Sequence, residues 1–311
     1  MIVAFDIGGS HIRAGRSVAP GAVDLLGMWP TPCGDFAALA GVLADAVAMA
    51  GPGARALALS LPGVVDPATG RARIANIPCL DGRDVAAALG AVLGLPVIVA
   101  NDAACFVLAE ARTGAARGHD NVFGIILGTG VGGGLVIGGR LVRGAGGYAG
   151  EWGHGPVLRT EARDHRGAAV HVPHFPCGCG QAGCVDTVGG ARGIERLWRH
   201  ITGTDRPSTG IVAALEAGEE AALRVAAVWA DLVSAPLAVV LNTVGASAVP
   251  VAGGLANADR LVAALDRMVR SRLLRRAAGP LLVRAGHRDA PGLIGAAMLG
   301  WESAGDGPRS G

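Results

Sequence analysis

Lysine is absent from this 311-residue chain, and all 27 of its basic residues are arginines. The absence excludes a P-loop nucleotidase, because that motif holds phosphates with the lysine of the pattern GxxxxGK[ST]. Charged residues make up only 17% of the chain and the net charge is +2, which argues against a nucleic-acid partner. Aromatic residues are scarce at 4%, but 51% of the residues are hydrophobic, so the chain can form a large core.

Long apolar runs are also missing. No uninterrupted apolar stretch approaches the about 20 residues that a membrane helix needs, so we expect no membrane partner. The chain enters an apolar strand at Ile2 without the basic n-region of a signal peptide, so we expect a cytoplasmic protein. In a reducing cytosol, three cysteines clustered within residues 177–184 favour a metal site over disulfides.

The alternation of apolar runs and turn residues predicts an α/β fold with two similar halves. Each half begins with a strand, a glycine turn (6–10 or 128–134) and another strand. We expect strands over 2–7, 12–18, 25–31, 56–61, 96–100, 122–127, 134–138, 141–143, 248–252 and 281–285. We expect helices over 36–50, 84–93, 102–113, 191–200, 209–217, 219–240, 258–275 and 291–302, and an irregular segment over 155–176.

The two glycine turns are candidate phosphate-binding hairpins. Glycine lets backbone N–H groups approach phosphate oxygens closely, and Asp6 before the first turn is placed to reach a magnesium ion or its waters. A tight hairpin without a ligand is the alternative for the first turn. The candidate nucleotide-binding residues are Asp6, Gly8, Gly9, Ser10, Gly128, Thr129, Gly130, Gly132, Gly253 and Gly254.

Asn101 and Asp102 follow one predicted strand and begin the next predicted helix. This is the usual position of ligand-binding groups in α/β folds. An aspartate there can act as a general base that accepts the proton of a substrate hydroxyl during phosphoryl transfer. It can equally cap the helix. The residues alone leave both interpretations open.

The clustered cysteines predict a structural zinc site. Glycines between them let the chain double back, and three thiols with one imidazole form a closed four-coordinate site. His154 is the predicted fourth ligand, and His174 is the alternative. With His154 bound, Glu151 lies beside the metal loop and can bind hydroxyl groups. The predicted ligands are therefore His154, Cys177, Cys179 and Cys184.

The order and spacing of these motifs resemble the ROK family of sugar kinases over residues 2–299. The matching segments are DIGGS (6–10), NDA (101–103), LGTGVGGG (127–134), GEWGH (150–154) and CGCGQAGC (177–184). The resemblance implies an actin-like, ribonuclease-H-like ATPase fold of two domains, commonly in homodimers. We expect a smaller domain of residues 1–118 plus 293–311, and a larger domain of residues 119–292 that carries the zinc knuckle.

The resemblance also implies an activity, with ATP, magnesium and structural zinc as cofactors. The expected reaction is phosphorylation of N-acetylglucosamine at its 6-hydroxyl, giving the 6-phosphate and ADP, with Asp102 as the general base. Glucose and N-acetylmannosamine are alternative substrates, and a non-catalytic sugar sensor is a further alternative. The sugar contacts implied by the resemblance are Asn76, Asn101, Glu151, His154 and Asp186.

Three positions depart from the family pattern. Ser10 stands where the family usually has threonine, which keeps the hydroxyl. Asp186 replaces the usual glutamate and glycines 189 and 190 replace a usual Ser-Gly, so the hydroxyl preference of the pocket is open. The family also contains sugar-responsive repressors with a DNA-binding domain ahead of the core. Because the first motif begins at Asp6, we expect no such domain here.

Overall fold

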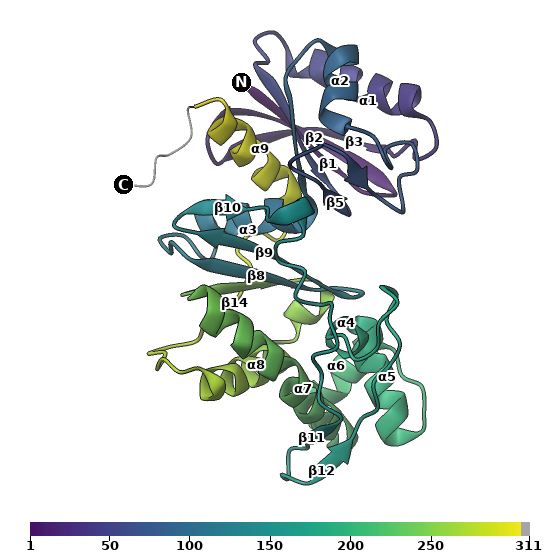
Figure 1. The fold of residues 1–311 in the computed structure, drawn as a ribbon, viewed down its shortest axis with the longest axis vertical. Coiled ribbons are helices and arrows are strands. Elements are labelled where there is room, and N and C mark those ends of the chain that lie inside the picture. Colours follow the sequence, from purple (N-terminus) through teal and green to yellow (C-terminus); the bar gives the residue numbers. More distant parts are fainter. Residues whose placement is uncertain (306–311) are drawn as a thin grey trace. The chain divides into compact units, whose positions relative to one another are not determined.

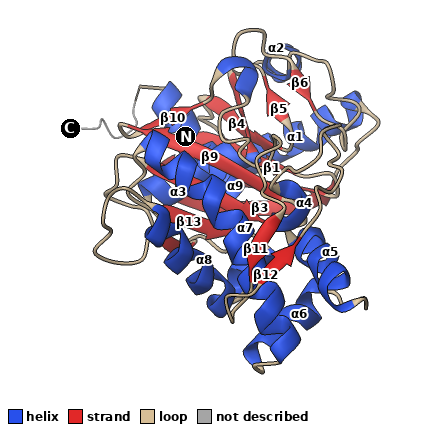
Figure 2. Cartoon of the chain, turned by 60° about the horizontal axis from the view of Figure 1, so that its bottom comes forward, coloured by secondary structure: helices blue, strands red, loops and turns tan. Residues whose placement is uncertain are grey.

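The computed structural model describes residues 1–305, which form two compact units. The first unit consists of residues 1–120, 134–149 and 286–305, and the second of residues 121–133 and 150–285. Figure 1 labels the elements of both units, and Figure 2 distinguishes their helices from their strands. The α/β class is confirmed. The predicted division into domains stays a prediction, and its residues 306–311 lie outside the described residues.

The first unit is built on a mixed sheet with the strand order β3-β2-β1-β4-β7. β1 (Ile2–Ile7) pairs antiparallel with β2 (His11–Ala19), which pairs antiparallel with β3 (Ala22–Pro30). On its other side, β1 pairs parallel with β4 (Ala56–Leu61), and β4 pairs parallel with β7 (Val97–Asn101). The central strand β1 therefore ends among the ends of β4 and β7, where ligand-binding groups gather in open α/β sheets.

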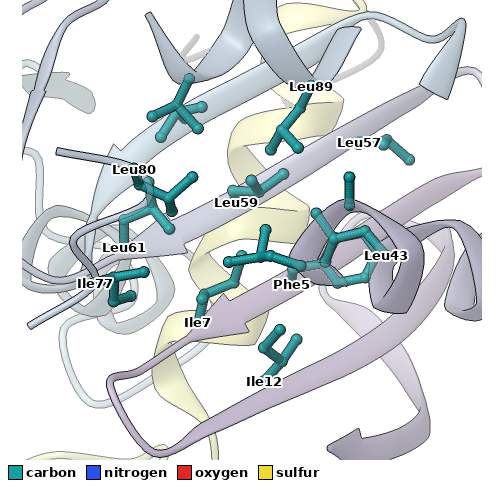
Figure 3. Packing of buried hydrophobic residues seen from close by; sticks show 14 of the residues in the cluster. Phe5, Ile7, Ile12, Leu43, Leu57, Leu59, Leu61, Ile77, Leu80 and Leu89 are labelled. Atoms are coloured by element: carbon teal, nitrogen blue, oxygen red, sulfur yellow. The ribbon is translucent and has the colours of Figure 1, made fainter. Parts of the chain in front are cut away.

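One face of β1 builds the larger core of this unit. Successive side chains of a strand point to opposite faces, so Val3, Phe5 and Ile7 share one face. They pack with α1 (Phe36–Ala50) and α2 (Val85–Leu93) in a cluster of buried residues. Figure 3 shows this packing around Phe5 and Ile7. Asp35 and Asp84 cap these two helices, as expected of aspartate before a helix.

The other face of β1 carries Ile2, Ala4 and, by the same alternation, Asp6. Ile2 and Ala4 pack against α3 (Asp102–Arg112) and α9 (Pro291–Ser303), which contact each other. Small residues in α9 permit this close packing. The buried face below α3 and α9 thus includes a carboxylate at the end of an otherwise apolar strand.

The second sheet has the strand order β10-β9-β8-β13-β14. In the second unit, β8 (Val122–Leu127) pairs parallel with β13 (Val249–Ala252), which pairs parallel with β14 (Leu282–Arg284). β9 (Val131–Ile137) belongs to the second unit in its first residues and to the first unit in the rest. That later part pairs antiparallel with β10 (Arg140–Val142).

The second unit also contains a long helix, α7 (Glu220–Val244), which contacts α5 (Ala191–Thr202), α6 (Ser208–Glu216) and α8 (Asp259–Arg272). It extends beyond the predicted end at 240 and passes Pro236. By length and hydropathy α7 could span a membrane, although its apolar residues do not form one uninterrupted run. Its apolar window is 67% buried inside the structure, as in a core helix.

Shorter elements add to these strands and helices within residues 1–305. β5 (Val64–Val65) pairs with β6 (Ala72–Arg73), and α4 (Asp186–Gly189) precedes α5. Two 3-10 turns cover Ala145–Gly147 and Gly254–Asn257.

The prediction of an irregular 155–176 segment was wrong in part. β11 (Glu161–Arg163) and β12 (Ala169–His171) form an antiparallel hairpin there. The Asp164 side chain closes the turn by accepting the N–H groups of Arg166 and Ala168.

Candidate functional site

Asp6 lies at the end of β1 beside a serine that the sequence analysis did not identify. Asp6 and Ser60 are paired in the register of β1 and β4, and the Ser60 hydroxyl donates to Asp6 Oδ1 at 2.8 Å. Burial raises the pKa of Asp6, while the Ser60 hydrogen bond and the charge of Arg13 oppose that rise. A Cβ added to Gly292 would collide with the Asp6 carboxylate. The start of α9 therefore lies directly against this carboxylate.

The first glycine hairpin joins β1 to β2. The Gly8 N–H donates to the carbonyl oxygen of His11 at 2.9 Å, which closes the turn. Ser10 is exposed in the turn, and Asn76 lies against Gly9. A Cβ added to Gly9 would be 3.0 Å from Asn76 Nδ2. The structure therefore brings together the hairpin and one predicted sugar contact from a distant loop.

The start of α3 separates the two interpretations of Asp102. The Asn101 side chain, not that of Asp102, caps the helix by accepting the Ala104 N–H at 2.8 Å. Asp102 is exposed in the first turn, and its Oδ1 accepts the N–H of Ala103 at 2.8 Å. Asn101 is therefore the N-cap residue, and Asp102 accepts a second N–H of the helix start while its side chain stays exposed.

The second glycine hairpin, between β8 and β9, is held by Asp186. Asp186 Oδ1 accepts the Val131 N–H at 2.8 Å, and a Cβ on Gly130 would collide with the same oxygen. Its other oxygen lies 3.9 Å from Cys177 Sγ. Thr129 is exposed at the tip. The carboxylate thus links the hairpin to the cysteine segment, which the sequence analysis did not foresee.

Gly253 and Gly254 follow β13 and differ in their surroundings. Gly253 has a φ of 91°, a conformation that favours glycine. A Cβ there would collide with the backbone of Leu127 and come within 2.6 Å of the Gly128 nitrogen. A Cβ on Gly254 would meet nothing within 4 Å. Gly253 therefore supports the start of the second hairpin, and Gly254 leaves open space beside it.

A tryptophan fastens the GEWGH motif to the same hairpin. Trp152 Nε1 donates to the Gly132 carbonyl oxygen at 2.9 Å, and the ring meets Phe123 edge-on at 6.2 Å between centroids. A Cβ on Gly153 would be 2.7 Å from the Val131 carbonyl oxygen. The hydrogen bond and the close packing hold the motif in place, a role for Trp152 that the sequence analysis missed.

One imidazole and three thiols meet in the second unit. The ligand atoms of His154, Cys177, Cys179 and Cys184 all lie within 4.8 Å of one another. His154 Nδ1 is 3.6 Å from Cys177 Sγ, and the sulfurs of Cys179 and Cys184 are 3.6 Å apart. Tetrahedral zinc with Zn–S bonds of about 2.3 Å separates its sulfur ligands by about 3.8 Å. The donor chemistry and the spacing of the cluster fit that ion.

The alternative ligand, His174, lies outside this cluster. Its Nε2 is 2.7 Å from the Leu158 carbonyl oxygen, and its ring lies 3.0 Å from where a Cβ on Gly183 would stand. Glu151 Oε2 is instead 3.9 Å from the Nε2 of His154. A carboxylate on the outer nitrogen of a metal-bound histidine orients the ring. Glu151 is placed for that role.

The electrostatics of the cysteines differ within the cluster. The backbone N–H of Gln181 lowers the pKa of Cys179 to about 7. Burial raises the pKa of Cys177 to about 11. The Gly155 N–H also points at Cys184 Sγ at 3.3 Å. Metal ligation requires thiolates, and N–H groups aimed at sulfur favour the charged form.

Two α/β units, each with a glycine hairpin between two strands, define the class of actin-like ATPases, and the comparisons with known proteins agree. The chain belongs to the ROK family, whose model matches residues 2–302. The family resemblance seen in the sequence is therefore confirmed.

Similar proteins include sugar kinases. The N-acetyl-D-glucosamine kinase of Pectobacterium atrosepticum is 38% identical over 306 residues, which cover 96% of this chain and 98% of that protein. The structure of the ROK hexokinase from Thermus thermophilus is 31% identical with a TM-score of 0.83, covering 98% of this chain and 99% of the other. A ROK family glucokinase from Streptomyces griseus, solved with glucose and AMPPNP, is 27% identical with a TM-score of 0.72, covering 96% and 98%.

Proposed function

We propose that this chain is an ATP-dependent kinase that phosphorylates N-acetyl-D-glucosamine at its 6-hydroxyl. The similarity to an N-acetyl-D-glucosamine kinase over 96% of the chain supports the choice of sugar. One structural observation carries the chemistry: Asp102 is exposed at the start of α3, while Asn101 supplies the helix cap. An exposed carboxylate that is not the N-cap residue suits a general base at that position.

In the proposed reaction, Asp102 accepts the proton of the sugar 6-hydroxyl. The hydroxyl oxygen bonds to the γ-phosphorus of ATP as the bond from that phosphorus to the β,γ-bridging oxygen breaks. ADP leaves with the electron pair of the broken bond, and the sugar 6-phosphate remains. A loose transition state needs little early deprotonation, so an aspartate of ordinary basicity is sufficient.

The phosphates of ATP are bound without lysine in this proposal. The backbone N–H groups of the two hairpins hold them, through Gly8, Gly9 and Ser10 in the first unit and through residues 128–132 in the second. Gly253 and Gly254 lie along the adenosine. Asp6 holds magnesium directly or through its waters, and Ser60 fixes the orientation of that carboxylate. The ion, when bound, lowers the charge repulsion between phosphate oxygens.

Zinc has a structural role in this proposal. His154, Cys177, Cys179 and Cys184 hold it, and the closed ligand set leaves no open position for a reacting group. The bound zinc would fix the position of the His154 imidazole and of Glu151 beside it. The proposed sugar contacts are Asn76, Asn101, Glu151, His154 and Asp186.

Glucose, N-acetylmannosamine and a sensor without catalysis remain the competing assignments. Asp186 bears on the choice of sugar, because one of its oxygens is committed to the Val131 N–H. The other oxygen is then the less engaged acceptor for a sugar hydroxyl. Asp186 is one methylene shorter than the glutamate usual in the family and already accepts one hydrogen bond. Both properties change which sugar hydroxyl groups it can bind.

The test is ADP release from magnesium-ATP with N-acetylglucosamine, glucose, N-acetylmannosamine and fructose. We expect kcat/KM to favour N-acetylglucosamine at least tenfold, a difference of about 1.4 kcal/mol. Preference for another sugar would change the substrate assignment but not the assignment as a kinase. No turnover with any sugar, in protein that is folded and carries zinc, would support the sensor instead.

We also propose that the protein is a cytoplasmic homodimer. Sedimentation equilibrium checks the oligomer by its mass. A mass twice that of the chain is expected, and a monomer at micromolar concentration would contradict it.

A further inference from the structure

A basic pocket of about 380 Å³ lies on α5 in the second unit, apart from the residues assigned above. Its charged lining consists of Arg192, Glu195, Arg196, Arg199, Asp205 and Arg206. Four guanidinium groups and two carboxylates give the lining a net charge of +2, and Glu219, which pairs with Arg206, lowers it to +1. Such a pocket attracts anions.

Part of this charge has no acidic partner. Arg199 pairs with Asp205, but their side chains are 69% and 73% exposed, so the pair is weak. Arg206 donates two hydrogen bonds to Glu219, at 2.6 and 3.2 Å. Within residues 1–305, the exposed side chain of Arg192 makes no ion pair and no hydrogen bond. Its guanidinium is ready to receive a ligand.

Arg196 is held in place without being neutralised. It donates to the Thr187 carbonyl oxygen and lies over the Phe175 ring, 5.4 Å from the centroid. Neither neighbour carries a negative charge. A guanidinium has five N–H donors, so most of its donors remain for an anion.

The pocket begins where the second glycine hairpin ends. The N–H groups of Ala191 and Arg192 donate to the carbonyl oxygens of Gly128 and Thr129 at 2.8 and 3.3 Å. A Cβ on Gly190 would be 2.7 Å from the Thr129 carbonyl oxygen. The first turn of α5 therefore lies directly on the hairpin, and Arg192 at this end of the pocket is held by that contact.

The arginines of α5 form a row. Arg192, Arg196 and Arg199 are spaced by four and three residues, so they share one face of the helix over a rise of about 10 Å. Planar guanidinium forks match the oxygens of phosphate groups. A single small anion would occupy one fork, whereas a row of forks matches a chain of linked phosphates.

We propose that the α5 pocket binds an oligophosphate, which is either a free oligophosphate or the phosphate tail of a nucleoside triphosphate other than the ATP assigned to the hairpins. The proposal goes beyond the kinase assignment. Binding requires no phosphoryl transfer, so a failure of the kinase proposal would leave it standing.

The experiment measures binding of inorganic tripolyphosphate to the full-length protein by calorimetry. Excess magnesium is present, and zinc content is checked before and after. The variants are Arg192→Ala, Arg199→Ala and the double variant. Arg267→Ala is the matched control, because Arg267 is an exposed arginine on α8 and its loss changes the net charge equally. Arg196 is left intact because it contacts Phe175 beside the cysteine segment.

We expect each pocket variant to weaken tripolyphosphate binding about tenfold, as loss of a charge-assisted hydrogen bond does, and the double variant to weaken it further. Competition with a non-hydrolysable ATP analogue identifies the nucleotide tail as the source, whereas simultaneous binding identifies a free oligophosphate. Absence of binding to the unmodified protein would overturn the proposal. An equal loss in the Arg267→Ala control would also overturn it.

Discussion

The two units hold their candidate sites by different physical means. In the first unit, Asp6 and Ser60 lie on paired strands of a buried sheet, and α9 covers them. In the second, Cys179 is exposed in a loop that turns at Gly180 and Gly183, both with positive φ. The sulfurs meet their side-chain neighbours at 3.6 to 3.9 Å, distances of weak contacts.

This difference separates folding from metal binding. A carboxylate between packed strands is oriented as soon as the core forms, whether or not a ligand is present. A loop of cysteines and glycines has no apolar core of its own, so the ion must supply the order. The first site is therefore expected to be preorganised, and the second to depend on zinc.

The largest effect is expected from Cys179→Ser. Loss of one zinc ligand should abolish stoichiometric zinc and lower the melting temperature by about 10 °C or more, since structural zinc contributes several kcal/mol. Metal analysis and calorimetry measure both. Cys33→Ser is the control, because Cys33 belongs to the first unit, where its thiol donates to the Gly9 carbonyl oxygen as a serine hydroxyl could. Full zinc content and an unchanged melting temperature in Cys179→Ser would show that the order of the second site does not depend on zinc.

Asp102→Asn should lower kcat by roughly 10²–10⁴, as loss of a positioned base does. Sugar affinity and melting should change little, because the first unit keeps its packing and its Asn101 cap. Steady-state kinetics and calorimetric sugar binding measure the two effects. Asp84→Asn replaces the capping aspartate of α2 and should leave kcat unchanged. Near-normal turnover in Asp102→Asn would show that Asp102 is not the general base.

Glu151→Gln should raise the KM for the sugar about tenfold, the expected cost of a lost charge-assisted hydrogen bond. The KM for ATP should stay within about twofold, and zinc should remain bound, because Glu151 faces the outer nitrogen of His154. Glu161→Gln on the exposed β11 strand is the control. Equal changes in both KM values would move Glu151 out of the sugar pocket.

Ser60→Ala should raise the KM for magnesium-ATP about three- to tenfold, because one hydrogen bond of about 1 kcal/mol to Asp6 is lost. Ser17→Ala is a matched control. Ser17 is equally buried in the same sheet, but it accepts the indole N–H of Trp301 at the opposite end of β1. If both variants change this KM alike, Ser60 acts through the core and not through Asp6.

The smallest effect concerns stability and pH. Because burial raises the pKa of Asp6, the folded state holds its proton more tightly than the unfolded state. Ionisation of Asp6 therefore costs stability as pH rises from the ordinary aspartate pKa to the raised value, and the full cost persists at neutral pH. Asp6→Asn should melt higher than the unmodified protein in magnesium-free buffer at pH 7.

That gain from Asp6→Asn should shrink as the pH falls toward the ordinary aspartate pKa of about 3.9, because Asp6 is then increasingly protonated in the folded state. Melting curves between pH 4 and 8 test the sign. A variant that melts lower throughout this range would show that the carboxylate stabilises the fold.

The local parts of the site were predictable from the sequence. Glycine turns after apolar strands and three cysteines within one short segment can be recognised from local sequence. His154 lies in the cysteine cluster, as predicted. The strands 2–7, 56–61 and 122–127 were predicted at their observed ends, because long apolar runs bounded by turn residues are the strongest local signal.

The supporting contacts were not predictable, because they join distant segments. Ser60 meets Asp6 across 54 residues, and Asp186 meets Val131 across 55. The only local sign that Ser60 has a special role was that it is the single polar residue in the apolar run 56–61. The capping role of Asn101 was also ambiguous, since either residue of an Asn-Asp pair can begin a helix. The β11–β12 hairpin escaped notice because its strands are too short to show a period.

The doublet Gly253-Gly254 illustrates how adjacent identical residues can carry opposite constraints. At position 253 any side chain would push into the backbone of Leu127, so variation there should be tolerated poorly. At position 254 a side chain would enter open space. A bulky side chain at that second position would consequently leave the turn beneath it intact and fill the space that the adenosine is proposed to occupy.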